Sequence, residues 1–398
     1  MRKTVVWLAF AAAGALASTP QHDPSRYLYV WAGDTTRAFL GVFDVRPAMP
    51  RYGRFVTMVP VGGGAVYPHH TELHLPPGGQ PFFANGYKSG RTFLFDWKVP
   101  EQPALVRELE AVPGFHSLHS FARLANGNVL TTIQFGSGQV PGNPGGLVLF
   151  DPIGHVLRTA SSADPRFPGA HIRTYSLEVL EPLDRVVTTS APMDTERTAN
   201  VVQIWRLSDL HLLATLPVTG IPGDSIEYYP FEARRLGDGR TVFLNTYNCG
   251  LYMITGIDGP TPAVRFVQAI GRGVTGCSVP VVVGRYWVIP VAYQHVILSY
   301  DLSDPSHPRV VSRLPTDSTF YPHWLGTDPY SDRIIVTDQG DGPGRMVMAR
   351  LDPSSGRLSW DEAFREKEDG PLGFDFTHVT WPDGTTGPSV PHGALFRP

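Results

Sequence analysis

Residues 82–86 and 92–96 read FFANG and TFLFD, two short apolar runs separated by a polar turn, the second of which ends in Asp. The same arrangement recurs along the chain at intervals of roughly fifty residues. Short apolar runs bounded by Gly, Asn and Asp are typical of β-strands joined by tight turns. The seven pairs of runs are 27–31 with 39–44, 82–86 with 92–96, 129–132 with 147–151, 185–189 with 201–205, 241–245 with 251–254, 286–290 with 297–301, and 334–338 with 346–350.

This repeat predicts an all-β fold, a seven-bladed β-propeller. A third run follows the pair, as residues 309–312 follow 297–301, and one more short strand precedes it. Four short strands per copy is the pattern of a propeller blade. Two β-sandwiches, the alternative, would not explain seven similar units. The innermost strands are expected near His70, His119, Ser176, Tyr229, Val279, His323 and His378.

The strand predicted at His378 has no later strands to complete its blade. We therefore expect the run that begins at Tyr27 to complete it, so that the ring closes by pairing of the N- and C-terminal strands and leaves no free edge. Residues 18–398 are then one propeller domain. The net charge of −3 argues against a nucleic-acid partner.

The first seventeen residues have the features of a secretory signal peptide. Arg2 and Lys3 are followed by an apolar stretch from Thr4 to Leu16 that is short for a membrane span. The triplet 15–17 reads ALA and fits a cleavage site after Ala17. We expect a periplasmic or secreted protein without stable membrane insertion after cleavage; an uncleaved anchor is the alternative.

Export to an oxidising compartment makes the two cysteines of the chain, Cys249 and Cys277, candidates for a disulfide. Two buried free thiols are the alternative, because sequence does not give the distance between their Cα atoms. Both cysteines fall in connections expected at the same face of the propeller.

Histidines recur at the start of the predicted innermost strands. Residues 67–72 read YPHHTE, 115–119 read FHSLH, 321–324 read YPHW, and 376–384 read FTHVTWPDG. Strand starts of this kind lie at one mouth of the channel, so we expect the histidines to converge there on one metal. The candidate ligands are His69, His70, His119, His323 and His378. Because side chains alternate along a strand, His69 and His70 are not both expected to reach the axis unless the strand begins after them.

Converging imidazoles suit zinc, copper or iron. A set of histidine ligands without thiolates favours copper, or alternatively non-haem iron, over structural zinc. Glu178 and Glu232 occupy similar positions in other blades and, with His116, are expected to support the ligands as hydrogen-bond partners. A salt bridge with an arginine such as Arg173 or Arg234 is the alternative for either glutamate.

Several motifs resemble the selenium-binding protein family, whose members include copper-dependent methanethiol oxidase. They are the opening 28–33 (LYVWAG), the pair His69-His70, the spacing of His116 and His119, 230–232 (PFE), 300–305 (YDLSDP), and 371–373 (PLG) followed by His378. The double His and the His-x-x-His are the specific parts. The similarity is patchy but runs through most of the chain after residue 17.

The resemblance implies a seven-bladed propeller with copper held by His69, His70, His119 and His378. It also implies oxidation of a small thiol by oxygen and water to an aldehyde, sulfide and hydrogen peroxide. This chain has His323 where the family has Gln. The family's Cys shortly after the His pair is replaced by residues 73–77 (LHLPP), so selenium attachment there is not expected.

The leading hypothesis is an exported copper-dependent oxidoreductase whose partners are a small thiol and O2. A non-haem iron oxygenase on a propeller is the second hypothesis. A non-catalytic propeller that binds a ligand or partner is the third, and histidines lying far apart would favour it.

Overall fold

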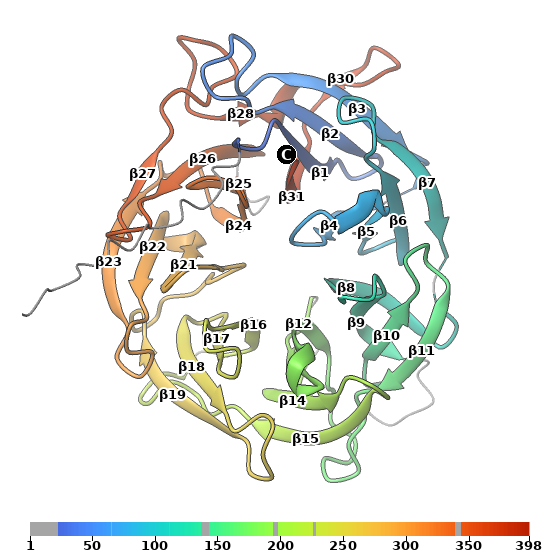
Figure 1. The fold of residues 1–398 in the computed structure, drawn as a ribbon, viewed down its shortest axis with the longest axis vertical. Coiled ribbons are helices and arrows are strands. Elements are labelled where there is room, and N and C mark those ends of the chain that lie inside the picture. Colours follow the sequence, from blue (N-terminus) through green and yellow to red (C-terminus); the bar gives the residue numbers. More distant parts are fainter. Residues whose placement is uncertain are drawn as a thin grey trace, which may run out of the picture.

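The computed structural model describes residues 23–64, 66–110, 112–136, 143–193, 198–225, 228–338 and 344–397. Antiparallel sheets radiate from a central channel as seven blades (Figure 1), which confirms the predicted seven-bladed propeller. The signal peptide expected at residues 1–17 lies outside the described residues. Among those described, no helix is both long and apolar enough to cross a membrane.

Each blade runs from an innermost strand at the channel to an outermost strand at the rim. Blade 1 contains β31 (Val390–Arg397), β1 (Tyr27–Gly33), β2 (Ala38–Asp44) and β3 (Phe55–Val61); blade 2 contains β4 (Pro68–Thr71), β5 (Phe82–Gly86), β6 (Arg91–Asp96) and β7 (Ala104–Leu109); blade 3 contains β8 (Phe115–Arg123), β9 (Val129–Gly136), β10 (Gly146–Phe150) and β11 (Val156–Ser161).

The remaining blades follow the same order. Blade 4 contains β12 (Thr174–Leu180), β13 (Arg185–Ser190), β14 (Val201–Arg206) and β15 (His211–Pro217); blade 5 contains β16 (Pro230–Arg235), β17 (Val242–Thr246), β18 (Gly250–Thr255) and β19 (Ala263–Ala269); blade 6 contains β20 (Val281–Val283), β21 (Tyr286–Val291), β22 (Val296–Asp301) and β23 (Arg309–Pro315); blade 7 contains β24 (Pro322–Thr327), β25 (Arg333–Asp338), β26 (Arg345–Leu351), β27 (Leu358–Trp360) and the short β28 (Phe374–Asp375).

The core lies between neighbouring blades. Strands β1 and β2 are buried along their whole length, because adjacent blades cover both of their faces. The outermost strand β7 instead alternates between exposed and partly buried residues. Trp31 of β1 shows the packing between blades: its ring contacts Phe95 of the next blade at 5.7 Å and its Nε1 donates to Asn85 O at 2.8 Å.

The ring closes through β31, which pairs antiparallel with β1 from Tyr27 opposite Arg397 to Gly33 opposite Val390. Closure by the two ends of the chain is therefore confirmed. The innermost strand predicted at His378 is wrong, because His378 ends the short 3-10 helix η4 (Phe376–His378). This helix leads into a separate hairpin of β29 (Val379–Thr380) and β30 (Thr386–Gly387), which precedes β31.

A buried ion pair fastens the N-terminal end of the first blade to the last blade. Asp328 accepts hydrogen bonds from Arg333 Nη2 at 2.7 Å and from Ser25 Oγ at 2.7 Å. Arg333 also donates to the backbone oxygens of Ser25 and Val45. Both charged side chains are fully buried.

Replacing Asp328 by Ala should destabilise the protein by about 3–5 kcal/mol, because Arg333 would remain buried without its counter-charge. Thermal denaturation of the two proteins measures the change. Asp209→Ala is the matched control, since Asp209 pairs with Arg206 on the surface. Equal melting temperatures for the two variants would contradict this role of the buried pair.

The contribution of Asp328 should also depend on pH. Burial by itself raises the pKa of Asp328, but hydrogen bonds from Ser331 and Ser25 and the charge of Arg333 lower it below the ordinary carboxyl value. A lowered folded-state pKa gives stability that is complete above the unfolded pKa of about 4 and is lost as the pH falls through the folded value. The difference in melting temperature between wild type and Asp328→Asn should be constant near neutrality and shrink in acid; a difference that grows on acidification would contradict the assignment.

Candidate metal centre

Five buried histidines gather at the channel. His69 and His70 lie on β4, His119 on β8, His323 on β24 and His392 on β31, and their exposed fractions are all 8% or less. These strands are the innermost strands of four consecutive blades and lie side by side around the channel (Figure 1). The structure therefore brings together four of the five predicted ligands and adds His392.

The imidazoles are close enough to act as ligands of one metal ion. The Nε2 atoms of His69 and His119 are 2.9 Å apart, and those of His323 and His392 are 3.0 Å apart. His69, His70 and His119 each offer a nitrogen within 4.8 Å of the others. The rings of His69 and His392, whose centroids are 4.1 Å apart, connect the two pairs.

A break in strand register explains how two adjacent histidines both reach the cluster. The pairing of β4 with β5 shifts between Pro68 and Thr71, which is the segment that contains His69 and His70. A bulge re-aims side chains that would alternate in a regular strand. The expectation that only one of the two could face the channel is therefore wrong for this strand.

Register shifts recur at the same place in the other innermost strands. They include His119 and Ser120 in β8, Tyr175 and Ser176 in β12, and His323 in β24. The shift in the pairing of β31 with β1 includes His392. Each of these strands thus has irregular backbone at its channel end, where the named side chains are attached.

Polar side chains from the second strands hydrogen-bond to this irregular backbone. Asn85 accepts from His70 N at 2.6 Å and donates to His119 O at 2.9 Å. Thr132 Oγ1 accepts from Ser120 N at 3.0 Å, and Thr337 Oγ1 donates to His392 O at 2.9 Å. Buried backbone groups that leave the regular ladder are satisfied in this way, which fixes the positions of the histidines.

The hydrogen bonds of His119 settle which of its nitrogens carries the proton. Nδ1 lies 2.9 Å from the backbone oxygen of Tyr175, which only accepts, so Nδ1 is the donor. Nε2 consequently keeps its lone pair and points toward His69. A backbone carbonyl that orients the far nitrogen of an imidazole is the usual support for a metal-binding histidine.

Burial keeps the five imidazoles neutral. It lowers the pKa of His119 to about 3 and that of His323 to about 4. Burial, together with the neighbouring histidines, lowers the pKa values of His69, His70 and His392 well below the ordinary range. Neutral imidazole is the form that binds metals.

The donor set fits a metal ion. Four buried ring nitrogens have no hydrogen-bond partner among the described residues: Nδ1 of His69, Nε2 of His70, Nδ1 of His323 and Nδ1 of His392. Two nitrogens bonded to one ion at about 2.0–2.1 Å are separated by about 3 Å, which is the spacing of each Nε2 pair. Five neutral imidazoles without a thiolate match the preference of copper, iron or zinc.

Four predicted site residues lie outside the cluster of five histidines. His378 is exposed on η4, and His116 is exposed and stacks on Phe135 at 4.9 Å. Glu178 lies 3.8 Å from Arg235, so the alternative of an ion pair holds for it. Glu232 is buried and pairs with Arg234 at 2.7 Å, but it also lines a cavity beside His70.

His392 was missed because the innermost strand of the closing blade was placed too early. A signal for it exists in the sequence, since the dipeptide Pro-His lies within the first three residues of three of these strands: Pro68-His69, Pro322-His323 and Pro391-His392. The intervening hairpin separates His392 from the predicted strand at His378.

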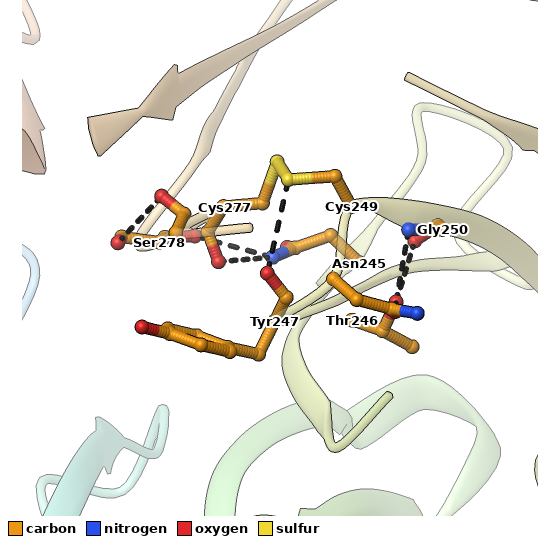
Figure 2. The surroundings of a disulfide bond; sticks show 9 residues. Asn245, Thr246, Tyr247, Cys249, Gly250, Cys277 and Ser278 are labelled. Atoms are coloured by element: carbon orange, nitrogen blue, oxygen red, sulfur yellow. Dashed lines mark hydrogen bonds between the residues drawn. A yellow bond between two sulfur atoms is a disulfide. The ribbon is translucent and has the colours of Figure 1, made fainter. Parts of the chain in front are cut away.

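Cys249 and Cys277 form a disulfide, with Cα atoms 5.2 Å apart, so the predicted bridge is present. Figure 2 shows Asn245 donating to the backbone oxygens of Cys277 and Ser278 beside it, at 3.2 and 3.3 Å. The bridge joins the β17–β18 turn to the segment that precedes β20 and thus connects blades 5 and 6.

An aromatic wall extends from the cluster toward this bridge. The ring of Tyr175 lies 3.9 Å from that of His119 and 4.3 Å from that of Phe231. The ring of Phe231 in turn lies 5.6 Å from that of Tyr247, which precedes Cys249 by two residues. The edge of the Trp324 ring closes the other side of His70, with centroids 4.9 Å apart. Aromatic rings thus pack directly against His119 and His70.

No protein-family model matches the chain, and no curated protein matches it significantly. Among solved structures, a hypothetical selenium-binding protein from Sulfolobus tokodaii is similar with a TM-score of 0.77 and 17% identity, over 94% of each chain. The periplasmic gluconolactonase of Pseudomonas aeruginosa is similar with a TM-score of 0.62 and 13% identity, over 94% of this chain and 99% of that one. At these identities the comparisons show the propeller fold alone.

Metal binding should depend on the cluster and not on His378. We expect His119→Ala and His392→Ala each to lower the metal affinity at least about tenfold, because each removes a buried ring nitrogen of the set. Metal analysis of protein purified without a polyhistidine tag measures this. His378→Ala is the control and should retain the wild-type content; loss of metal in that variant alone would contradict the assignment of His392.

Proposed function

We propose that this protein is an exported, copper-dependent oxidase of small thiols. The reaction is that of a methanethiol oxidase: a thiol, oxygen and water give an aldehyde, sulfide and hydrogen peroxide. The observation that carries the proposal is the buried all-histidine donor set. The structural likeness to the Sulfolobus tokodaii selenium-binding protein supports it, together with the motifs of the same family in this sequence.

The residues that would hold the metal are His69, His70, His119 and His392, with His323 beside His392. When bound, copper supplies one-electron redox chemistry and affinity for a thiolate. The protein's own contribution is a set of neutral imidazoles fixed by bulged strands. The rings of Tyr175 and Trp324 pack against those of His119 and His70 and keep bulk water from them.

Iron is the second candidate metal, and the ligand environment disfavours it. Non-haem iron oxygenases commonly use two histidines and a carboxylate, or histidines supported by carboxylates. Here Glu178 pairs with Arg235 and Glu232 pairs with Arg234, and neither has a hydrogen bond to one of the five imidazoles. Copper therefore fits the set better.

The proposal predicts about one copper per chain and consumption of methanethiol that depends on it. Untagged protein should lose activity when copper is removed by a chelator and regain it when copper alone is added. Metal analysis combined with assays for sulfide and hydrogen peroxide measures both.

The same metal analysis distinguishes the copper oxidase from an iron oxygenase and from a non-catalytic propeller. Iron in the purified protein, with no response to copper, would favour an iron oxygenase. A protein that binds neither metal would be a non-catalytic binding propeller.

A further inference from the structure

A narrow cavity lies beside His70, with Trp324 in its lining. Its volume is about 20 Å³, and its polar lining consists of His70, Thr71, Ser120, Ser176, Glu232 and Arg234. His70 belongs both to this cavity and to the metal-binding cluster. Whatever occupies the cavity is therefore next to the proposed metal site.

Only one of the two carboxylate oxygens of Glu232 accepts hydrogen bonds from described residues. Oε2 accepts from Arg234 Nη1 and from Ser176 Oγ, each at 2.7 Å. Oε1 has no partner among the described residues, although the residue is only 1% exposed. A buried carboxylate oxygen without a partner calls for a hydrogen-bond donor.

His70 presents a second unsatisfied atom to the same space. Its Nδ1 lies 3.0 Å from Ser120 Oγ, while its Nε2 has no partner among the described residues, and the residue is 2% exposed. In the metal-free protein two buried polar atoms without partners thus line this cavity. In the metal-bound protein His70 Nε2 would be a ligand, and Glu232 Oε1 and the hydroxyl groups of Ser120 and Ser176 would remain as partners. A cavity of at least about 10–15 Å³ with two to four polar partners is sufficient for one water molecule.

We propose that this cavity binds one water molecule, which donates to Glu232 Oε1, and that Glu232 is the proton acceptor for the water consumed in the oxidation. The catalytic part of this inference rests on the proposed function. The binding part rests only on the cavity and its two unsatisfied atoms.

The stoichiometry gives such a water a role. Loss of two electrons and two protons from methanethiol to oxygen gives thioformaldehyde and hydrogen peroxide. Water oxygen then adds to the carbon as one water proton passes to Glu232 Oε1 and the other is retained on oxygen. Glu232 returns its proton to sulfur and then takes the hydroxyl proton as the C–S bond breaks and the C=O bond forms. This second proton passes from Glu232 to the departing hydrosulfide, which gives hydrogen sulfide and formaldehyde.

A crystal structure of the metal-free wild-type protein at a resolution that shows ordered water tests the binding site. We expect one water within about 3.2 Å of Glu232 Oε1. An empty cavity would overturn the proposal. This measurement is independent of copper and of activity, so it decides the binding site even if the protein proves not to oxidise thiols.

The catalytic role is tested with Glu232→Gln, in which the amide oxygen retains an acceptor for Arg234 and Ser176 but no proton can be taken up. We expect the turnover number to fall about 100-fold or more, with copper content unchanged. Glu178→Gln is the matched control, because Glu178 lies on the neighbouring innermost strand, outside the cavity lining.

The control should keep the wild-type rate within about twofold. If Glu232→Gln retains both the copper and more than half of the wild-type rate, the catalytic role is overturned. If the wild-type protein with bound copper oxidises no thiol, the proposed function is wrong. The catalytic role of Glu232 is then wrong as well, and only the water-binding site is decided, by the crystal structure.

Discussion

The antiparallel pairing of β1 with β31 is the interaction on which the rest of the molecule depends. A propeller buries its core between blades, so a ring left open would expose the apolar faces of its first and last blades. Pairing the two ends of the chain in one sheet removes that edge. The buried Asp328–Arg333 pair and Ser25 reinforce the seam at the point where the described chain begins.

Closure also produces the metal-binding cluster. β31 enters the ring between β24 and β4, and its His392 lies between the histidines of those two strands. Segments from both ends of the described chain thus contribute to one small volume. The cluster is a property of the closed ring, because His323 and His392 come from its last strands and His69 and His70 from its first complete blade.

Within the closed ring, bulges determine which side chains face the channel. A regular innermost strand would direct every second residue inward, yet His69 and His70 both belong to the cluster. The bulges cost regular ladder hydrogen bonds, and Asn85, Thr132 and Thr337 replace them from the second strands. Full burial then keeps the imidazoles neutral, which prepares them for a metal and leaves no charge to be solvated.

Much of the fold was predictable because it is carried by local periodicity. The paired apolar runs, such as 82–86 with 92–96, matched the second and third strands of all seven blades. The recurrent histidines at strand starts placed His70, His119 and His323 at the channel without any knowledge of distances. Glu178 and Glu232 look equivalent in the sequence, but neighbouring arginines and a cavity give them different surroundings.

The sequence by itself determined the number of blades, the closure by the chain ends and the approximate level of the site, because repeats and turn residues record local structure. Only the tertiary structure decided that β31, and not the segment at His378, completes the ring, since a hairpin inserted before the last strand looks like a strand start in the sequence. It also decided that His69 and His70 share one cluster and that Glu232 Oε1 faces a cavity. These outcomes depend on bulges and on contacts between blades, which are formed by residues far apart in the chain.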